Sequence, residues 1–418
     1  NVSSRILKIL LYTLNFSPEP IGIGKYSGEM ATWFANKGHD VRVVTSPPYY
    51  PHWCIGGHYS NKWIKEKIDN SVTVYRCPLW VPKKPSGSKR ILHLLSFALS
   101  SFPVILCQTF WRPDIIFLVE PTLFCAPQSL LVARLSKSYS CLHIQDFEVD
   151  AAYSLGLLNA SFLRSIAQSF ERFLMKRFDL ISTISSKMLE RVLEKGVDSE
   201  RSLLFRNWVD IDGLNRRCDK PRPYREELGL AANSFVALYS GNLGKKQGLD
   251  IIPMVARLLP HVTFVVCGDG SGRADLLDLC LGIDNIVFLS VQPIDDLGCL
   301  LKMADIHLLL QSADAADLVM PSKLTGMLAS ERPIVATAQA GTEVANVVKG
   351  RGLIVPPGQP EPLAEAISSL ISDDAIREDF GKAGLEYAKL YLDKNAVLEA
   401  FEADISKRLD LLKDRVDT

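Results

Sequence analysis

Short apolar runs rich in β-branched residues alternate with amphipathic stretches along the whole chain. In the first half, the predicted strands are Ile6–Leu11, Val41–Thr45, Ile115–Val119, Cys141–Gln145 and Leu180–Ile184. In the second half, they are Phe235–Tyr239, Thr263–Cys267, Ile286–Leu289, Ile306–Leu310, Ile334–Thr337 and Leu353–Val355. Apolar runs separated by helical patterns are typical of parallel strands that are covered on both faces. The pattern therefore predicts an α/β protein with doubly wound parallel sheets.

The apolar periodicity breaks down near residues 207–224, where Asp, Asn, Arg and Pro residues replace it. A boundary there divides the 418 residues into two parts of ordinary domain size. We therefore expect two Rossmann-like domains, one over residues 1–206 and the other over residues 207–394. The remaining stretch, residues 395–418, is predicted to form a long helix.

One apolar stretch is unusual, because Ile91–Phe110 contains no Asp, Glu, Lys or Arg. Its length would suffice to cross a bilayer. However, Pro103, three serines and Gln108 make it only moderately hydrophobic. We expect a pair of buried or membrane-surface helices, with a transmembrane helix as the alternative.

Composition narrows the function classes. The 47 Lys and Arg residues balance 47 Asp and Glu residues, and 47% of the chain is hydrophobic. These values exclude a disordered chain and argue against nucleic-acid binding through bulk charge. The nine cysteines form no CxxC pair, which favours free thiols in a reducing cytoplasm over a disulfide scaffold or a zinc site. The apolar run Arg5–Phe16 lacks a cleavage site and is predicted to be the first strand rather than a secretory signal.

The neutral total conceals a local imbalance. Residues 61–112 contain nine basic side chains and two acidic ones, and they include the uncharged run Ile91–Phe110. Basic residues beside an apolar helix are attracted to anionic lipids. We therefore expect residues 61–112 to bind a membrane surface, which would place the protein peripherally on the inner face of the plasma membrane. A solvated loop before an ordinary core helix is the alternative.

Two glycine loops follow predicted strands. The first contains Gly22, Gly24 and Lys25 and opens a helix. The second contains Gly241, Gly244, Lys245, Lys246 and Gly248. Glycines let backbone amides approach a ligand, and a helix N-terminus favours anions. Neither loop has the spacing of a dinucleotide fingerprint or of a Walker A motif, so a plain turn and solvated lysines remain the alternatives.

Two further stretches place polar groups after strands. Ser322 is predicted to start a helix, which would leave the backbone amides of Lys323, Leu324 and Thr325 free to face an anion. Asp146 follows the predicted strand Cys141–Gln145, where ligands of α/β proteins bind. His143 in the same strand has an alternative role as a hydrogen-bonded core histidine.

Several of these runs occur in the order seen in retaining glycosyltransferases of the GT-B fold. YSGNLGKKQGLD, CGDGSGRADL and PSKLTGMLASERPIVAT resemble the second domain of that family. SPEPIGIGKYSGEM and HIQDFEVDAAYSLGLL resemble one subgroup, the bacterial exopolysaccharide enzymes of the colanic-acid type. The resemblance covers nearly the whole chain. It implies two Rossmann-like domains facing across a cleft, a C-terminal helix that returns to the first domain, and a nucleotide-diphosphate sugar as donor.

The resemblance also implies roles for individual positions. Donor contacts are implied at Gly22, Gly24, Lys25, Gly241, Asn242, Gly268, Ser322, Lys323, Leu324 and Thr325. Catalytic roles are implied for Lys245 and Lys246 at the diphosphate and for Asp146 beside the acceptor. Asn242 occupies a position where many relatives have arginine. The run Asn207–Asp210 resembles the family's interdomain turn.

One family motif is incomplete. The paired glutamates of the E-x7-E motif correspond here to Leu318 and Gly326, although Asp317 lies next to the first position. Since the second glutamate of the family contacts the ribose, we expect ribose and base recognition to differ in this chain.

Together these features predict retaining sugar transfer from a UDP- or GDP-sugar to a lipid-linked or growing polysaccharide acceptor. Lysines and helix amides would stabilise the charge that builds up on the leaving diphosphate, so no metal and no cofactor is expected. Asp210 and Asp212 form a D-x-D triplet, but their place in the linker favours a structural role. A sugar-nucleotide 2-epimerase and a non-catalytic subunit of a membrane enzyme are the alternatives, and no nucleic-acid partner is expected.

Overall fold

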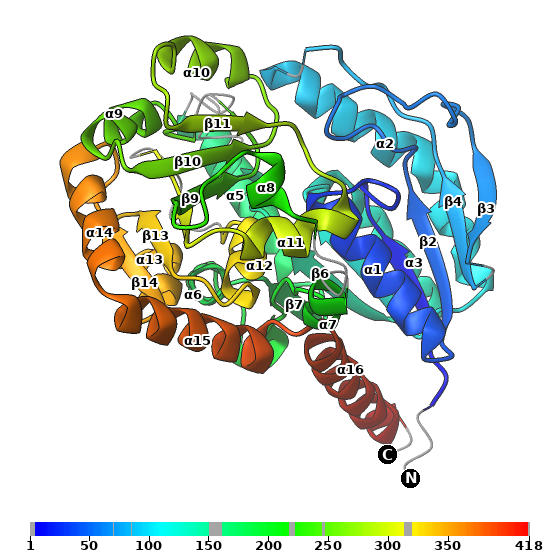
Figure 1. Ribbon diagram of the computed structural model, residues 1–418. Coiled ribbons are helices and arrows are strands. Elements are labelled where there is room, and N and C mark those ends of the chain that lie inside the picture. Colours follow the sequence, from blue (N-terminus) through cyan, green and yellow to red (C-terminus); the bar gives the residue numbers. More distant parts are fainter. Residues whose placement is uncertain are drawn as a thin grey trace. The chain divides into compact units, whose positions relative to one another are not determined.

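The computed structural model describes residues 5–69, 71–84, 86–149, 161–216, 222–244, 247–312 and 320–416. The chain divides into two compact units (Figure 1). Unit 1 comprises residues 1–205 and 398–418, and unit 2 comprises residues 206–397. The first boundary lies one residue from the predicted one and the second three residues away. The second differs because the final helix begins within unit 2, where the Lys394 amide donates to the Val209 carbonyl at 3.1 Å.

Unit 1 contains one eight-stranded sheet in the order β3-β4-β2-β1-β5-β6-β7-β8. Its strands are β1 (Lys8–Tyr12), β2 (Asp40–Thr45), β3 (Ile64–Ile68), β4 (Val72–Arg76), β5 (Ile115–Glu120), β6 (Tyr139–Ile144), β7 (Leu180–Thr183) and β8 (Ser202–Leu204). All neighbours are parallel except β3 and β4. The five predicted strands of this half are confirmed, whereas β3, β4 and β8 were not predicted.

The helices of unit 1 cover both faces of this sheet. They are α1 (Gly22–Asn36), α2 (Gly87–Cys107), α3 (Ala126–Ser136), α5 (Ser161–Met175), α6 (Ser186–Glu194) and α16 (Lys394–Val416). On one face, Phe401 of α16 packs against Phe34 of α1 and Phe117 of β5, with ring centroids 6.4 and 5.6 Å away. On the other face, the Tyr12 hydroxyl of β1 bonds to Ser101 of α2 at 2.5 Å and to Gln128 of α3. The C-terminal helix therefore does return to the first domain.

The apolar stretch forms a single helix, α2, followed by a short 3-10 turn at Gln108–Phe110. The prediction of a helix pair was wrong, because the helix continues through Pro103. It does so with one side built into unit 1, where Phe97, Ser101 and Ile105 are completely buried, while Leu99 is 75% exposed. Within the described residues, Gly87–Phe110 is the segment whose length and composition would allow a membrane span, and a third of its most apolar window is buried.

Unit 2 contains a six-stranded, wholly parallel sheet in the order β11-β10-β9-β12-β13-β14. Its strands are β9 (Phe235–Ser240), β10 (Val262–Cys267), β11 (Ile286–Leu289), β12 (Ile306–Leu309), β13 (Ile334–Thr337) and β14 (Gly352–Val355). All six strands predicted for this half are confirmed. This is the order of a dinucleotide-binding sheet, in which the strand order reverses between β9 and β12.

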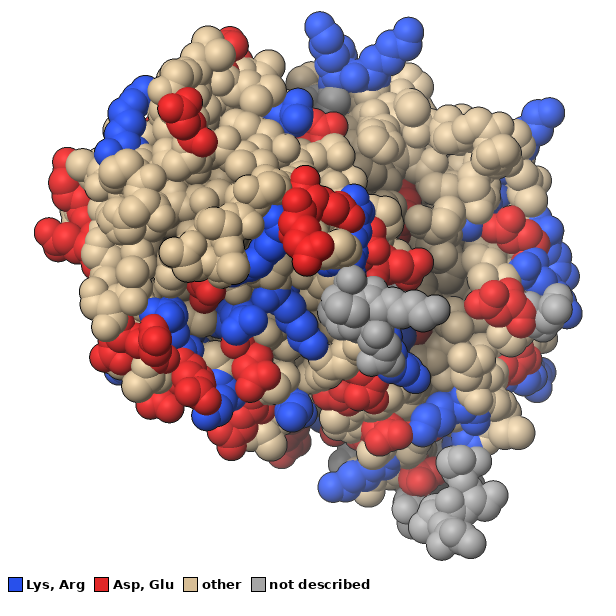
Figure 2. Space-filling view, in the orientation of Figure 1, with Lys and Arg blue, Asp and Glu red and all other residues tan. Residues whose placement is uncertain are grey.

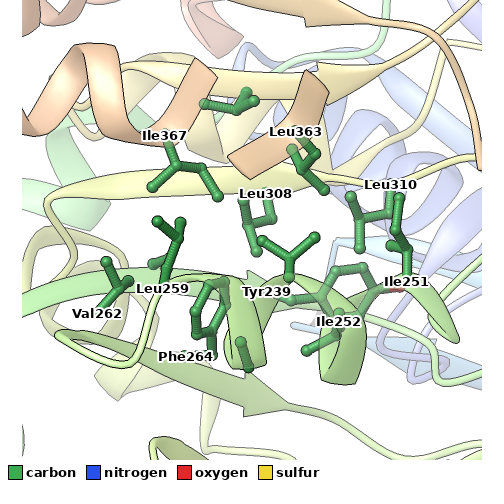
Figure 3. Packing of buried hydrophobic residues seen from close by; sticks show 14 of the residues in the cluster. Tyr239, Ile251, Ile252, Leu259, Val262, Phe264, Leu308, Leu310, Leu363 and Ile367 are labelled. Carbon is green, nitrogen blue, oxygen red and sulfur yellow. The ribbon is translucent and has the colours of Figure 1, made fainter. Parts of the chain in front are cut away.

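The helices of unit 2 are α7 (Ile211–Arg216), α8 (Tyr224–Glu227), α9 (Ile251–Leu258), α10 (Arg273–Leu279), α11 (Leu297–Lys302), α12 (Lys323–Ala329), α13 (Glu343–Val348), α14 (Pro360–Ser372) and α15 (Asp374–Tyr391). Figure 3 shows α9 and α14 packing their apolar side chains, such as Ile252 and Leu363, onto strand residues such as Leu308. Tyr239 of β9 belongs to this core and is completely buried. Its hydroxyl lies at the end of the strand, where the candidate site begins.

Candidate donor site and acceptor-side carboxylates

The ends of β9 and β10 come unusually close in unit 2. The Gly241 amide donates to the Cys267 carbonyl at 2.9 Å, and the Gly268 amide donates to the Leu289 carbonyl at 3.1 Å. A Cβ atom at Gly268 would lie only 1.9 Å from the Gly241 carbonyl oxygen. Only glycine fits this approach. The sequence predicted Gly241 and Gly268 as ligand contacts, and the structure gives Gly268 a packing reason as well.

The loops after these two strands are also tied together. The Leu243 amide donates to the Asp269 carbonyl at 2.9 Å, and the Gly272 amide donates to the Leu243 carbonyl at 2.7 Å. Asn242 is exposed between them. Asn242 was predicted to contact the donor. Its exposed side chain stands on a loop that backbone hydrogen bonds hold in place.

Lys323 joins this loop from the start of α12. Its stem passes over Gly241, where a Cβ atom would lie 3.2 Å from the lysine Cδ. The Lys323 ammonium donates to the Tyr239 hydroxyl at 3.2 Å and lies 4.3 Å from the centre of that ring. The Tyr239 hydroxyl donates in turn to the Asn242 carbonyl at 2.8 Å. A cation is therefore held at the carboxyl end of β9, beside the point where the strand order of the sheet reverses.

Burial tunes the charge of this group. It lowers the pKa of Lys323 to about 8, because taking the ammonium out of water disfavours its charged form, and no carboxylate pairs with it among the described residues. At neutral pH the side chain is still mostly protonated. An anion at this place would replace the lost hydration, and this is the chemistry that a diphosphate offers.

The start of α12 differs from its prediction. Ser322 occupies the N-cap position, but its hydroxyl makes no capping hydrogen bond. The Leu324 amide donates to the Pro321 carbonyl at 3.0 Å, and the Thr325 hydroxyl donates to the Ser322 carbonyl at 2.8 Å. The expectation that the Leu324 amide is free was wrong, because the tight turn at Pro321 uses it.

Some predicted site residues lie outside the described residues. They are Lys245 and Lys246 of the glycine loop, and the same holds for Asp317 and Leu318 at the first position of the incomplete glutamate motif. Gly326, which replaces the family's second glutamate, is described. A Cβ atom there would lie 3.2 Å from the Cδ1 atom of Leu301 on α11, so this position of α12 meets an apolar neighbour.

The glycine loop of unit 1 packs against a buried carboxylate of the same unit. α1 begins at Gly22, and a Cβ atom at Gly24 would lie 2.6 Å from Cβ and 2.7 Å from Oε2 of Glu19. Glu19 is buried and accepts hydrogen bonds from the Tyr49 and Tyr50 amides, both at 3.0 Å. Gly24 therefore makes room for this carboxylate.

Glu19 and Lys25 are the charged residues of this loop. Burial raises the pKa of Glu19 above its ordinary value, although its hydrogen bonds act against the shift. Sequence reasoning missed Glu19, since its partners lie thirty residues further along the chain. Lys25, also a predicted donor contact, is half-buried, with its ammonium 5.1 Å from the centre of the Tyr26 ring.

Carboxylates gather at the ends of β5 and β6. Asp146, predicted to face the acceptor, is exposed just after β6. Glu120 is completely buried at the end of β5, and burial together with Glu171 and Glu148 raises its pKa well above the ordinary value. Burial also raises the pKa of Glu148 to about 7. The Glu148 carboxylate accepts from the Leu123 amide at 2.6 Å. No role for Glu120 or Glu171 was predicted from the sequence.

One cation balances this cluster. Lys195 donates to Glu171, and both side chains are buried. Its ammonium also lies 4.9 Å from the centre of the Phe147 ring. Burial beside other carboxyl groups thus favours the protonated forms of Glu120 and Glu148, whose pKa values are raised.

Two residues have the structural roles that the sequence analysis left open for them. The Nδ1 atom of His143 bonds to the Ser182 hydroxyl at 2.9 Å, and burial lowers the pKa of His143 to about 3. His143 is therefore a neutral core histidine. Asp210 accepts a hydrogen bond from the Gly213 amide at 2.8 Å, which caps the start of α7. In the parts of the chain that the structure describes, no three His, Cys, Asp or Glu side chains are placed to hold a metal ion.

Comparisons with known proteins agree with the two-unit fold. Residues 22–208 match the glycosyl transferase 4-like domain, and residues 222–387 match the glycosyl transferases group 1 family. The chain is 44% identical over 407 residues to WcaI of Escherichia coli (strain K12), provisionally assigned as a colanic acid biosynthesis glycosyl transferase. The match covers 96% of this chain and all of WcaI.

Solved structures share the fold at low sequence identity. Sucrose-phosphate synthase from Thermosynechococcus elongatus superposes with a TM-score of 0.73 and 15% identity, covering 97% of this chain and 99% of that one. HepE of Anabaena, solved in complex with UDP, gives a TM-score of 0.69 and 17% identity, covering 96% of this chain and all of HepE. At these identities the likeness concerns the fold alone.

Proposed function

Because the chain belongs to the glycosyltransferase family and has its GT-B fold, we propose that it moves a sugar from a nucleotide-diphosphate sugar to an acceptor hydroxyl with retention of configuration. The donor is a UDP- or GDP-sugar. The observation that carries this proposal is the cation of Lys323, held over Gly241 by Tyr239 where ligands of α/β sheets bind.

The proposed chemistry follows from charge. The bond between the sugar C1 atom and the diphosphate oxygen breaks, and a bond from C1 to the acceptor oxygen forms. Negative charge builds up on the leaving diphosphate, where the buried Lys323 ammonium stabilises it without reorganisation of solvent. Lys245 and Lys246 would add charge from the neighbouring loop. Leaving-group stabilisation by these cations requires no metal ion in this proposal.

The acceptor side of the proposal lies in unit 1. Asp146 is exposed at the end of β6 and is the group we propose for orienting the acceptor hydroxyl or taking its proton. Since WcaI carries an assignment to colanic acid biosynthesis, we propose exopolysaccharide assembly as the context and a lipid-linked saccharide as the acceptor. Such an acceptor would place the protein on the inner face of the plasma membrane.

The absence of a carboxylate at Gly326 favours a second candidate function, that of a non-catalytic subunit of a membrane enzyme. A non-catalytic subunit would not need the ribose contact that the family's second glutamate supplies. The neighbouring Leu301 methyl group also makes this position less suited to a charge. Binding of the donor nucleotide separates the two functions, because only the transferase needs it.

The test is a donor assay with the full chain. Purified protein is incubated with UDP- and GDP-sugars, with and without lipid-linked saccharide acceptors, and products are followed by mass spectrometry. We expect acceptor-dependent sugar transfer and loss of transfer in Lys323→Met. Clean conversion of the donor to its epimer without acceptor would identify a 2-epimerase. A protein that neither binds nor consumes any donor would be the non-catalytic subunit.

A further inference from the structure

Three helices of unit 1 share one face of its sheet. The chain moves from β1 to β2 in one direction across the sheet and from β5 through β6 to β7 in the other. Because crossovers between parallel strands are right-handed, α1 lies on one face, and α2, α3 and α5 lie on the other, where α6 follows at the β8 edge. The contacts agree, since Tyr12 meets both α2 and α3. Tyr12 is paired with Leu118 of β5, so Glu120, two residues further on and coupled to Glu171 of α5, points to that same face.

Each of these three helices exposes large apolar side chains. The exposed residues are Leu92, Leu99 and Phe102 on α2, Leu131 and Leu135 on α3, and Phe162, Ile166, Phe170 and Phe173 on α5. By contrast, α1 on the opposite face buries Met30, Trp33 and Phe34 and exposes no large apolar side chain within its bounds. On that opposite face, the described part of α16 exposes only two large apolar side chains, Leu411 and Leu412 near its end, so the apolar exposure is concentrated on α2, α3 and α5.

The pattern on α5 is the clearest. Phe162, Ile166, Phe170 and Phe173 are spaced by three or four residues, so they form one line along the helix. Phe162 is 72% exposed. The opposite side of the helix carries Glu171, which is buried. The helix therefore presents a line of exposed apolar side chains on the side opposite to the buried Glu171.

Two tryptophans are held beside α2. The Trp63 indole donates to the Ser100 carbonyl at 3.0 Å, and the Trp80 amide donates to the Ser96 hydroxyl at 2.9 Å. Both side chains are nevertheless largely exposed. Tryptophan is the residue most typical of the boundary between bilayer and water, where an apolar ring and a polar edge are both accommodated.

Charge is distributed one-sidedly over this helical face. The single carboxylate in α2, α3 and α5 is Glu171, which is buried against Lys195. Exposed basic side chains stand on these helices or directly beside them, namely Lys83, Lys84, Lys89, Arg112, Arg134, Lys137, Arg172, Lys176 and Arg177. In Figure 2, the surface over α2 is mostly tan, with blue side chains near the end where the helix begins. The three helices themselves expose no carboxylate, although Asp179 beyond the end of α5 and Glu190 and Glu194 of α6 are exposed near them. A surface of apolar and basic side chains like that of α2, α3 and α5 complements an anionic bilayer.

The same features argue against other occupants. A second copy of the chain would bring the same basic side chains together, and their repulsion opposes a dimer through this face. A transmembrane arrangement of α2 would expose Ser101 and its hydrogen bond to Tyr12, which lie in the interior of the unit. The helices are therefore suited to lying on a membrane and not to crossing it.

We infer that the outer surface of α2, α3 and α5 is a docking face for an anionic lipid bilayer. The bilayer covers the apolar line on each helix, and its headgroups pair with the surrounding lysines and arginines. This face is broader than residues 61–112, because it includes α3 and α5. It does not depend on the proposed sugar transfer, since every residue involved belongs to unit 1 and none belongs to the donor site.

The test is flotation of the full chain with large unilamellar vesicles. The vesicles consist of phosphatidylcholine alone or with roughly one third phosphatidylglycerol. We expect at least about tenfold stronger partitioning to the anionic vesicles at low salt and a marked loss at high salt. No binding to anionic vesicles at low salt would overturn the inference.

Matched variants identify the face. Phe170→Ser with Phe173→Ser removes two exposed rings from α5, and Leu281→Ser with Val291→Ser removes two exposed apolar side chains from unit 2. We expect the α5 pair to weaken vesicle binding by at least about tenfold and the unit 2 pair to leave it unchanged. An equal loss of vesicle binding in both pairs would show that exposed apolar side chains anywhere on the protein bind lipid, and would overturn the assignment to this face.

Two further measurements exclude the remaining explanations. Circular dichroism and thermal unfolding establish that the variants fold. A wild-type dimer that the α5 pair converts to monomers, with no vesicle binding, would show that a second copy covers the face and would overturn the inference. Nucleotide binding is measured on the same samples, so failure of the proposed transferase function and failure of lipid docking are read separately.

Discussion

The first strand of each sheet, β1 in unit 1 and β9 in unit 2, runs into a loop that carries glycines and a lysine. In unit 1, Gly24 makes room for the buried Glu19, which anchors the backbone at Tyr49 and Tyr50. In unit 2, the glycines let two strand ends approach and leave the Lys323 ammonium beside the loop. Glycines after the first strand thus serve internal packing in unit 1, whereas in unit 2 Gly241 lies beneath the Lys323 side chain and is approached closely by Gly268.

This difference is the reason to propose an anion site in unit 2 and not in unit 1. Both loops lie at the carboxyl ends of parallel strands, where ligands bind in such sheets. Of the two loops, only that of unit 2 combines a close strand approach with a partly buried lysine, Lys323, that has no carboxylate partner among the described residues. The unit 1 loop contains a buried carboxylate, which disfavours a second anion nearby.

The largest expected effect is on the strand approach in unit 2. Gly268→Ala places a Cβ atom against the Gly241 carbonyl oxygen, so we expect about 3 kcal/mol of destabilisation and loss of nucleotide binding. Urea unfolding and thermal shift measure the two effects. Gly57→Ala is the control, because a Cβ atom there meets nothing within 4 Å. A Gly268→Ala protein as stable as this control would contradict the account.

The next effect concerns the charge of Lys323. Because burial lowers its pKa to about 8, the ammonium loses its proton as the pH rises from 7 to 9. We expect the affinity for UDP or GDP to fall about tenfold over this range, since the charged form binds the diphosphate. Isothermal titration calorimetry at several pH values measures it.

The matched variant for this titration is Lys323→Met. We expect it to bind more weakly at pH 7, by roughly ten- to hundredfold, and to show no pH dependence between 7 and 9. Lys349→Met, an exposed lysine of unit 2, should behave like the wild type. Retention of the pH dependence in Lys323→Met would assign the titration to another group.

A smaller effect tests the role of Gly24. If this glycine serves Glu19, Gly24→Ala should destabilise the wild type more than it destabilises the Glu19→Gly protein, where the clashing Cβ is absent. We expect a coupling free energy of about 1 kcal/mol in a double-mutant cycle measured by urea unfolding. Strict additivity would show that Gly24 has another purpose, such as ligand contact.

The smallest effect is a pH dependence of unfolding in unit 1. The folded pKa of Glu148 is about 7, above its ordinary value of 4.5, so the folded state holds this proton more tightly than the unfolded state. The resulting stabilisation is present below pH 4.5 and is lost as the pH rises through 7. We expect Glu148→Gln to unfold at a less pH-dependent temperature than the wild type between pH 6 and pH 8. Identical profiles would contradict the raised pKa.

Most of the fold could be predicted because the strands are buried on both faces and appear as continuous apolar runs. β3 escaped prediction because it is an antiparallel strand at the sheet edge, where Lys65 and Lys67 alternate with partly buried residues. β8 has only three residues. α2 was predicted as a pair because Pro103 usually ends a helix, whereas here the packing of Phe97 and Ile105 supports a continuous one.

The candidate site was predictable in its parts but not in its contacts. Lys323 and Gly241 were both assigned to the diphosphate from local motifs. Their meeting through Tyr239 depends on residues 84 positions apart, which no local pattern encodes. The same holds for Glu19, whose partners follow it by about thirty positions. The prediction for Leu324 was wrong for the opposite reason. A local turn places the Pro321 carbonyl where it accepts a hydrogen bond from the Leu324 amide, which a regular helix start would leave free.

The proposed function depends most on the Lys323–Gly241 site of unit 2, which we propose binds the diphosphate of a nucleotide sugar. Isothermal titration calorimetry of the full chain with nucleoside diphosphates and the matching monophosphates, UDP against UMP and GDP against GMP, tests it most directly. The account predicts that one diphosphate binds at least about tenfold more tightly than its monophosphate, and that Lys323→Met removes most of this difference. Equal affinities for diphosphate and monophosphate, or no binding of any nucleotide, would contradict it.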